Sequence, residues 1–141
     1  MKKLQIVPIE GLSVSLDKLV YEYNDKDLPA DTPHAFIYFL TISNSSNRTI
    51  TLLGRKWILQ SLSEYSIIEG EKIIGQTPVL APGESFSYNS YHLASENIKA
   101  KGAFYGIDEF NQVIHVQVPE FDMIVPGYKK SKTQNESRRS Q

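Results

Sequence analysis

The sequence predicts an all-β sandwich of about seven to nine short strands. Short segments in which apolar and polar residues alternate with period two recur at roughly 8–12-residue intervals, and turn-forming residues separate them. No segment shows a convincing helical periodicity. A length of 141 residues suits one domain that is large enough to bury a core.

The first strands are predicted from alternation and from the loop that separates them. Leu12, Val14 and Leu16 alternate with polar residues, which is the period of a half-buried strand. Residues 24–33 gather Asp, Asn and Pro, and these residues favour a loop. Residues 35–43 form the clearest strand, and because both of its faces are apolar, we expect it to lie centrally between two packed layers.

A polar hairpin connection at residues 44–48 is expected to lead into the next strand, residues 49–62. Apolar residues lie at even positions up to residue 52 of this strand and at odd positions from residue 53 onward. A strand that changes parity needs an extra residue, so we expect a β-bulge at Gly54. The bulge would change the direction of Arg55 relative to Trp57, which we expect in the core.

The second half predicts shorter strands and tight turns. Residues 67–68 begin a short strand, and the Pro-Gly pair at residues 82–83 suits a type II turn because glycine accepts a positive φ. Residues 85–91 and the hairpin at residues 102–118 follow. A proline then resets the alternation, so we expect residues 121–125 to form a separate last edge strand.

Charge is distributed unevenly along the chain. The hydrophobic fraction of 40% and the charged fraction of 22% are ordinary, and the net charge of −1 gives no overall attraction to nucleic acid or membrane. Residues 1–127, the predicted domain, carry ten Lys/Arg against fifteen Asp/Glu, a net charge of −5. Residues 128–141 carry five Lys/Arg against one Glu, and we expect a disordered basic tail that could contact nucleic acid only weakly.

Several chemistries and locations are excluded or disfavoured by composition. The chain has no cysteine, which excludes disulfides, thiol nucleophiles and Cys-ligated zinc. The N-terminus has no apolar segment of secretory length, and no run approaches the ~18 apolar residues of a membrane span. We therefore expect a soluble cytoplasmic protein that does not contact membranes.

Four segments carry a family resemblance. They are AFIYFLTISN from residue 35, ITLLGRKWIL from residue 50, EGEKIIGQTPVLAPGESFSY from residue 69, and VQVPEFDMIVPG from residue 116. In order and spacing these segments resemble the ApaG domain family, over about residues 13–127.

The resemblance implies an immunoglobulin-like or fibronectin type III-like sandwich. Members occur as small bacterial proteins, and the domain also occurs in F-box proteins and in a polymerase delta-interacting protein, where it is taken as an interaction module. Bacterial members are associated with cobalt resistance and magnesium efflux, and the family brings no established catalytic activity. The function expected here is a non-catalytic protein-interaction module with a protein partner, linked to divalent-cation homeostasis; a homo-oligomer also remains open.

The family usually carries a G-x-G-x-x-G loop, which corresponds here to residues 70–75. Lys72 stands where the middle glycine is expected. A dinucleotide site would need a helix directly after the loop, and Pro78 follows Gly75 too closely for one. Two interpretations remain: a tight turn between strands, or a nest of backbone N–H groups with Lys72 as counter-charge. The nest would make the chain a pyrophosphate-binding or nucleotide-binding or hydrolysing protein, which is the alternative function.

The candidate binding residues surround this loop and the tryptophan strand. They are Arg55, Lys56, Glu69, Gly70, Lys72, Gly75 and Gln76. The functional interpretation is a contact with a partner or an anion. The structural alternative places Trp57 in the core and leaves the two cations in solvent or paired with Glu69 or Glu71. No catalytic residue is predicted, because the chain has no G-x-S-x-G elbow and no arguable Ser–His–Asp arrangement.

No metal site or cofactor is expected. The three histidines, His34, His92 and His115, are isolated in sequence, which does not favour metal ligation. The aspartates at positions 25, 27 and 31 could attract a hard cation, but their spacing lacks the glycine and distal glutamate of an EF-hand loop. The metal phenotypes associated with the family do not require this chain to bind metal.

Overall fold

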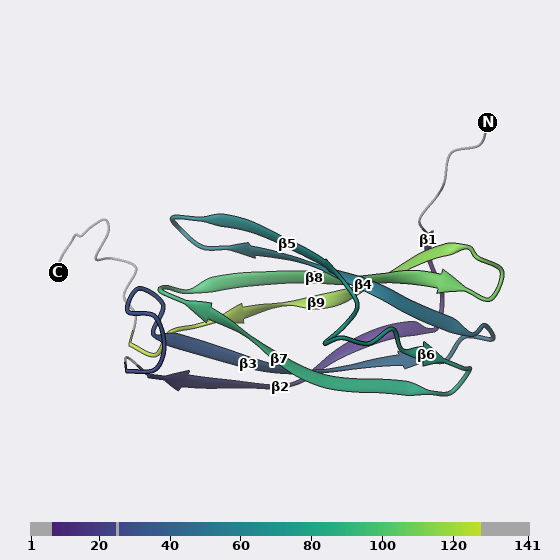
Figure 1. Ribbon diagram of the computed structural model, residues 1–141, viewed down its shortest axis with the longest axis horizontal. Helices are drawn as coiled ribbons and strands as arrows, with labels where there is room; N and C mark the ends of the chain where they lie inside the picture. Colours follow the sequence, from purple (N-terminus) through teal and green to yellow (C-terminus); the bar gives the residue numbers. More distant parts are fainter. Residues whose placement is uncertain (1–6, 25, 128–141) are drawn as a thin grey trace.

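The computed structural model describes residues 7–24 and 26–127 (Figure 1), and within these ranges it contains nine strands and no helix. The strands are β1 (Val7–Pro8), β2 (Leu12–Tyr23), β3 (His34–Asn44), β4 (Ile50–Gln60), β5 (Tyr65–Glu71), β6 (Val79–Leu80), β7 (Ser85–Ala94), β8 (Ile98–Asp108) and β9 (Val113–Met123). The predicted fold class and strand number are confirmed. The predicted tail at residues 128–141 lies outside the described residues, and no helix capable of crossing a membrane occurs among the described ones.

The strands form two sheets that are stacked as layers (Figure 1). One sheet has the order β1-β9-β8-β4-β5, with β6 paired to another part of β4, and the other has the order β2-β3-β7. The core lies between them and includes Phe36 and Leu40 from β3, Leu52 from β4, Phe104 from β8 and Ile114 from β9. Alternating side chains of each strand reach this core, as the period of a strand requires.

Strand β3 is central in its sheet, but only one of its faces packs against the other layer. Tyr38 and Leu40 are buried on the inner face. Ile37 and Phe39 on the opposite face are half-buried, and the Lys18 ammonium lies 5.7 Å from the centroid of the Phe39 ring. The predicted position between two packed layers is therefore wrong, because the sandwich has only two layers and neighbouring side chains cover the outer face.

The connection at residues 44–48 is not a hairpin, because β3 and β4 belong to different sheets. The side chain of Asn44 is fully buried at this crossing. Its Nδ2 donates to the carbonyl oxygens of Arg48 at 2.7 Å and of Leu80 at 2.9 Å. Its Oδ1 accepts the N–H of Ser46 at 3.0 Å and the Ser46 hydroxyl at 2.6 Å. The Asn44 side-chain amide thus provides hydrogen-bond partners for the backbone where the chain passes from one sheet to the other.

The β-bulge expected at Gly54 is confirmed. The register between β4 and β8 shifts between Leu52 and Gly54, which makes Leu53 the extra residue. Leu52 is buried before the bulge and Trp57 after it, whereas Leu53 is 36% exposed, so the core-facing positions change from even to odd across the bulge. Trp57 is buried as expected, and its ring packs over Gly102, where an added Cβ would lie 2.6 Å from the ring.

Several strand boundaries in the second half differ from the prediction. Strand β7 continues to Ala94, beyond the expected end at residue 91, and β8 begins at Ile98, before the expected start at residue 102. Strand β5 is longer than expected, and β9 continues through Pro119 to Met123, so the expected separate strand at residues 121–125 is wrong. The register with β8 shifts near this proline, which lets the strand absorb it and continue. The predicted turn at residues 82–83 is confirmed: Gly83 has a φ of 90°, and the N–H of Glu84 donates to the carbonyl of Ala81 at 2.9 Å.

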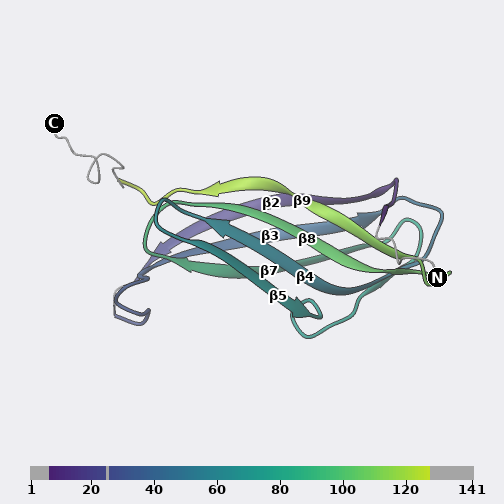
Figure 2. The same ribbon diagram turned by 90° about the horizontal axis from the view of Figure 1, so that it is seen from above.

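Strand β5 extends beyond the edge of the opposite sheet. Figure 2 shows β9 over β2, β8 over β3 and β4 over β7, with β5 outermost on its side. The three-stranded sheet ends at β7, so no strand of that sheet lies beneath β5. The burial pattern agrees, because every residue of β5 is exposed or half-buried.

Candidate functional site

The overhanging strand presents apolar side chains to solvent on both of its faces. Tyr65 is 62% exposed, Ile67 is 52% exposed and Ile68 is 41% exposed. Because successive residues of a strand point to opposite faces, Tyr65 and Ile67 share one face with Glu69 and Glu71, and Ile68 lies on the other. We call these five side chains the β5 surface.

Most of the predicted binding residues meet at the C-terminal half of β5. In the register of β4 with β5, Arg55 lies opposite Gly70 and Lys56 lies opposite Glu69. Lys72 follows β5 directly. Arg55 and Lys56 are neighbours in one strand, so their side chains leave opposite faces of the sheet and do not form one cationic patch.

The guanidinium of Arg55 holds the end of β5. Its Nη1 donates to the carbonyl oxygen of Glu71 at 3.0 Å and to that of Lys72 at 2.8 Å. Gly70 provides the necessary space, since a Cβ added there would lie 2.7 Å from Nη1. Arg55 therefore donates to backbone carbonyl oxygens of the protein and does not pair with the side chain of Glu69 or Glu71.

The glycine-containing loop closes as a tight turn. Ile73 and Gln76 exchange backbone hydrogen bonds of 2.8 and 3.0 Å around Ile74 and Gly75, whose φ angles are 42° and 79°. This is the pattern of a two-residue type I′ turn. Lys72 has a φ of 69°, the left-handed conformation that the family's middle glycine suits, and its N–H donates to a β4 carbonyl at 2.6 Å. Three of the loop's N–H groups are thus engaged within the chain.

A buried histidine packs in the core near this site. The ring centroid of His92 lies 4.9 Å from that of Tyr38 and 5.2 Å from that of Trp57. Burial lowers the pKa of His92 to about 4, so the ring is neutral at pH 7. Its Nε2 and the hydroxyl of Tyr88 have no hydrogen-bond partner in the described part of the chain. Burial also raises the pKa of Tyr88.

Candidate metal ligands do not gather in the structure. Within residues 7–24 and 26–127, no three His, Cys, Asp or Glu side chains are placed to hold one metal ion. His34 Nδ1 lies 2.7 Å from the Tyr21 hydroxyl. Of the acidic loop, residue 25 is outside the described residues, and Asp27 accepts a hydrogen bond of 2.9 Å from Asn24 Nδ2.

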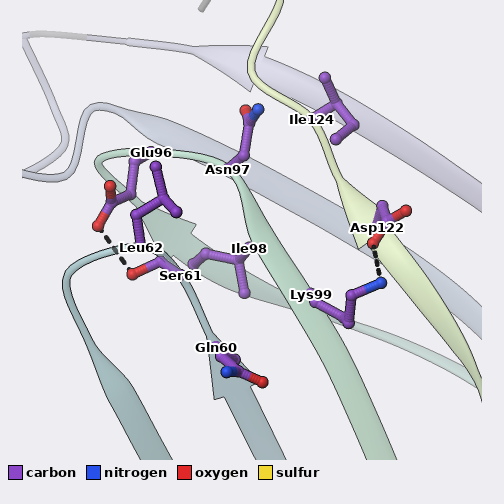
Figure 3. Close-up of a pocket in the computed structure, with 9 residues that line it drawn as sticks. All are labelled: Gln60, Ser61, Leu62, Glu96, Asn97, Ile98, Lys99, Asp122 and Ile124. Atoms are coloured by element: carbon purple, nitrogen blue, oxygen red, sulfur yellow. Dashed lines mark hydrogen bonds and ion pairs between the residues drawn. The ribbon is translucent and has the colours of Figure 1, made fainter. Parts of the chain in front are cut away.

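An open hollow of about 340 Å³ lies beside the tip of the β4–β5 hairpin (Figure 3). It is lined by Gln60, Ser61, Leu62, Glu96, Asn97, Ile98, Lys99, Asp122 and Ile124. Its charged groups pair with neighbours: Lys99 Nζ lies 3.2 Å from Asp122 Oδ1, and Glu96 Oε2 accepts the Ser61 hydroxyl at 2.7 Å. Leu62 and Ile124 are exposed apolar side chains of this hollow.

Sequence reasoning did not identify Tyr65, Ile67 and Ile68 as site residues. Apolar residues in a short strand are usually buried, and nothing local in the sequence distinguishes an overhanging strand from a covered one. Their exposure follows from the different widths of the two sheets, which is a property of the whole fold.

Comparison with known proteins gives a consistent result. The model of the ApaG domain family matches residues 24–107. The chain is 31% identical over 102 residues to the Protein ApaG of Enterobacter sp. strain 638, covering 71% of this chain and 82% of that one. It is 26% identical over 117 residues to the Protein ApaG of Shewanella woodyi, covering 82% and 93%.

A solved structure shares the fold. The crystal structure of the ApaA protein from Bordetella pertussis superimposes with a TM-score of 0.72 at 25% identity, covering 88% of this chain and all of that one. The matched region contains the bulged tryptophan strand, the overhanging β5 and the glycine-containing turn. The chain therefore belongs to the ApaG domain family.

Proposed function

We propose that this protein is a non-catalytic interaction module and that the β5 surface is its contact site. The observation that supports this most strongly is the exposure of Tyr65, Ile67 and Ile68 on a strand that the second sheet leaves uncovered. Tyr65 and Ile67 lie on one face of the strand and Ile68 on the other. Exposed apolar side chains with charged neighbours are typical of protein-binding sites.

The energetics of burial support a protein partner. Covering a large apolar side chain contributes roughly 1.5–3 kcal/mol. Tyrosine is also among the residues that dominate binding energy at interfaces. Glu69 and Glu71 follow the apolar side chains along β5, Lys56 lies opposite Glu69, and these charged groups would form part of the polar rim.

The alternative, a small-anion site at residues 70–75, has less support. The N–H groups of Lys72, Ile73 and Gln76 already donate to carbonyl oxygens within the chain. An anion nest needs several such groups free and convergent. Arg55, the nearest cation from β4, is bound to two carbonyl oxygens.

A capture experiment tests the interaction proposal. The full chain, carrying an affinity tag, is incubated with lysate of its source cell and covalently cross-linked. Tyr65→Ser combined with Ile67→Ser removes much of the β5 surface, and Phe110→Ser combined with Val79→Ser is a matched control, since these side chains are 73% and 59% exposed elsewhere. We expect wild type and control to recover the same partner and the β5 variant to lose it. Equal recovery by all three proteins, or no reproducible partner, would contradict the proposal.

A thermal-shift experiment separates the alternatives. Pyrophosphate, nucleotides, Mg²⁺ and Co²⁺ are each added to the intact protein and to Lys72→Gly. A ligand present at 100 times its Kd stabilises a protein by about 2.7 kcal/mol. We expect no shift with these ligands. A saturable shift that depends on Lys72 would favour the anion site instead.

A further inference from the structure

The unpaired backbone of β5 faces solvent along one side. Strand β5 pairs only with β4 among the described strands. Two backbone hydrogen bonds show which residues of β5 bond to β4. The Ser61 N–H donates to the Glu64 carbonyl at 2.9 Å, and the Lys72 N–H donates to the Leu53 carbonyl at 2.6 Å. Even-numbered residues of β5 thus bond to β4, and the N–H and C=O groups of the odd-numbered residues, Ile67 among them, point away from it.

Arg55 marks where this open edge ends. Its guanidinium occupies the carbonyl oxygen of Glu71, which removes the last acceptor of the open edge, and that of Lys72 just beyond the strand. The donors and acceptors left for a partner are therefore those of Tyr65, Ile67 and Glu69, together with the N–H of Glu71. A row of this kind is a template for one added strand.

The edges of the three-stranded sheet are less suited to a partner. The three-stranded sheet ends at β2 and β7. Strand β2 has a register shift between Leu16 and Lys18, a device that protects an edge, and Tyr23 is its exposed large apolar residue. The exposed large apolar residue of β7 is Tyr91, and the other exposed side chains of this strand are serines and an asparagine. Strand β5 exposes three such residues within seven positions.

The charge of β5 indicates the chemistry of its partner. Its sequence YSIIEGE contains two glutamates and no Lys or Arg, and Glu64 precedes it. Lys56 lies opposite Glu69 on the β4 side, and Lys72 follows the strand, so the open side of β5 itself carries only the carboxylates. Pairing with β5 of a second copy would add three more carboxylates and supply no cation from that strand. The chain's own segment at residues 128–141 is basic, but it contains a single aromatic and no aliphatic residue to cover Ile67 and Ile68.

We propose that β5 accepts an extended, basic-apolar segment of a partner protein as an added antiparallel strand; this rests on the proposed interaction function. Cationic side chains of that segment lie opposite Glu71 and Glu69. Apolar side chains lie opposite Ile68, Ile67 and Tyr65. Backbone hydrogen bonds provide attraction, and the order of basic before apolar residues along the segment provides direction and specificity.

A capped peptide, Lys-Thr-Arg-Val-Ile-Thr-Val, has this order and is the test ligand. Binding to the full-length protein is followed by NMR of isotope-labelled backbone amides. We expect the amides of Ile67 and Glu69 to shift and to gain protection from hydrogen exchange. A charge-reversed peptide with Glu in place of Lys and Arg should bind at least about tenfold more weakly, and so should a peptide of residues 128–141.

Two variants separate backbone pairing from side-chain contact. Ile67→Pro removes an N–H that points away from β4, so the β4–β5 pairing is kept while the added strand loses a donor. Ile67→Thr changes the side chain but keeps the donor. We expect Ile67→Pro to weaken peptide binding at least about tenfold more than Ile67→Thr does, with both variants showing wild-type spectra outside β5.

Specific outcomes would overturn the inference. It fails if the peptide binds at β7, binds equally after charge reversal, or leaves β5 unchanged. It also fails if sedimentation shows the protein to be a dimer whose β5 amides are already protected. In any of these cases, loss of the captured partner by Tyr65→Ser with Ile67→Ser would still support the interaction function, so the two proposals can fail separately.

Discussion

Gly70 lies opposite Arg55 in the β4–β5 register, and its missing side chain is the space through which the guanidinium reaches the end of β5. The family's first loop glycine thus serves a packing role here. A Cβ at this position would displace Arg55 Nη1 from the carbonyl oxygens of Glu71 and Lys72.

Gly70→Ala should therefore destabilise the protein by about 1 kcal/mol, the net value of the hydrogen bonds that Arg55 makes. The steric cost itself is small, because the end of a flexible arginine can move. In an Arg55→Ala background the same substitution should cost less. Urea unfolding of both single variants and the double variant measures the coupling; strictly additive effects would contradict the packing role of Gly70.

Ile74 occupies a conformation that disfavours its side chain. Its φ of 42° is left-handed, and a β-branched residue is rarely found there. Ile74→Asn would create the Asn-Gly pair that type I′ turns prefer, and we expect it to stabilise the protein by about 1 kcal/mol. Ile124→Asn is a matched control, because Ile124 has similar exposure without a left-handed φ. An equal effect of both substitutions on the urea midpoint would show that the left-handed φ does not disfavour isoleucine at position 74.

Asn44 joins the two layers through a buried amide. Asn44→Asp keeps the shape but removes both donors to the carbonyl oxygens of Arg48 and Leu80, and it buries a charge. We expect a loss of about 2–3 kcal/mol in the free energy of unfolding. Asn47→Asp in the same connection is exposed and should change stability by less than about 0.5 kcal/mol. Equal effects at the two positions would rule out this role for Asn44.

His92 makes stability depend on pH. Its pKa is about 4 in the folded protein because burial disfavours the charged ring, whereas an unfolded histidine has a pKa of about 6.5. The unfolded state therefore binds more protons between these values, and stability should fall as pH falls from about 6.5 to 4, by roughly 3 kcal/mol in full.

The variant His92→Phe should remove much of this slope in urea unfolding followed across pH, with His92→Leu as a second variant. His115→Gln, at a half-buried position on β9, is the control and should keep the slope. A wild-type slope in both His92 variants would show that another group controls the transition.

Much of the fold could be predicted because its signals are local. Alternation located most strands, the parity change at residues 52–53 located the bulge, and the Pro-Gly pair located its turn. The crossing after Asn44 and the continuation of β9 through Pro119 could not be predicted, since both depend on which strands become neighbours.

The candidate site could be predicted only in part, for the same reason. The family resemblance predicted a shared site for Arg55, Lys56, Glu69, Gly70 and Lys72. The β4–β5 register confirms that these residues lie close together. The apolar half of the β5 surface depends on a sheet that ends one strand earlier than its partner. That difference in width is set by packing across the whole domain, and no residue of β5 encodes it locally.

The most direct test of an open β5 edge is amide hydrogen exchange of the free, full-length protein. The amides of Ser66, Ile68 and Gly70 bond to β4 in the register and should be protected. Those of Tyr65, Ile67 and Glu69 should exchange rapidly, because they point to solvent. Equal protection at both sets of amides would show that the edge is already covered and would contradict the account.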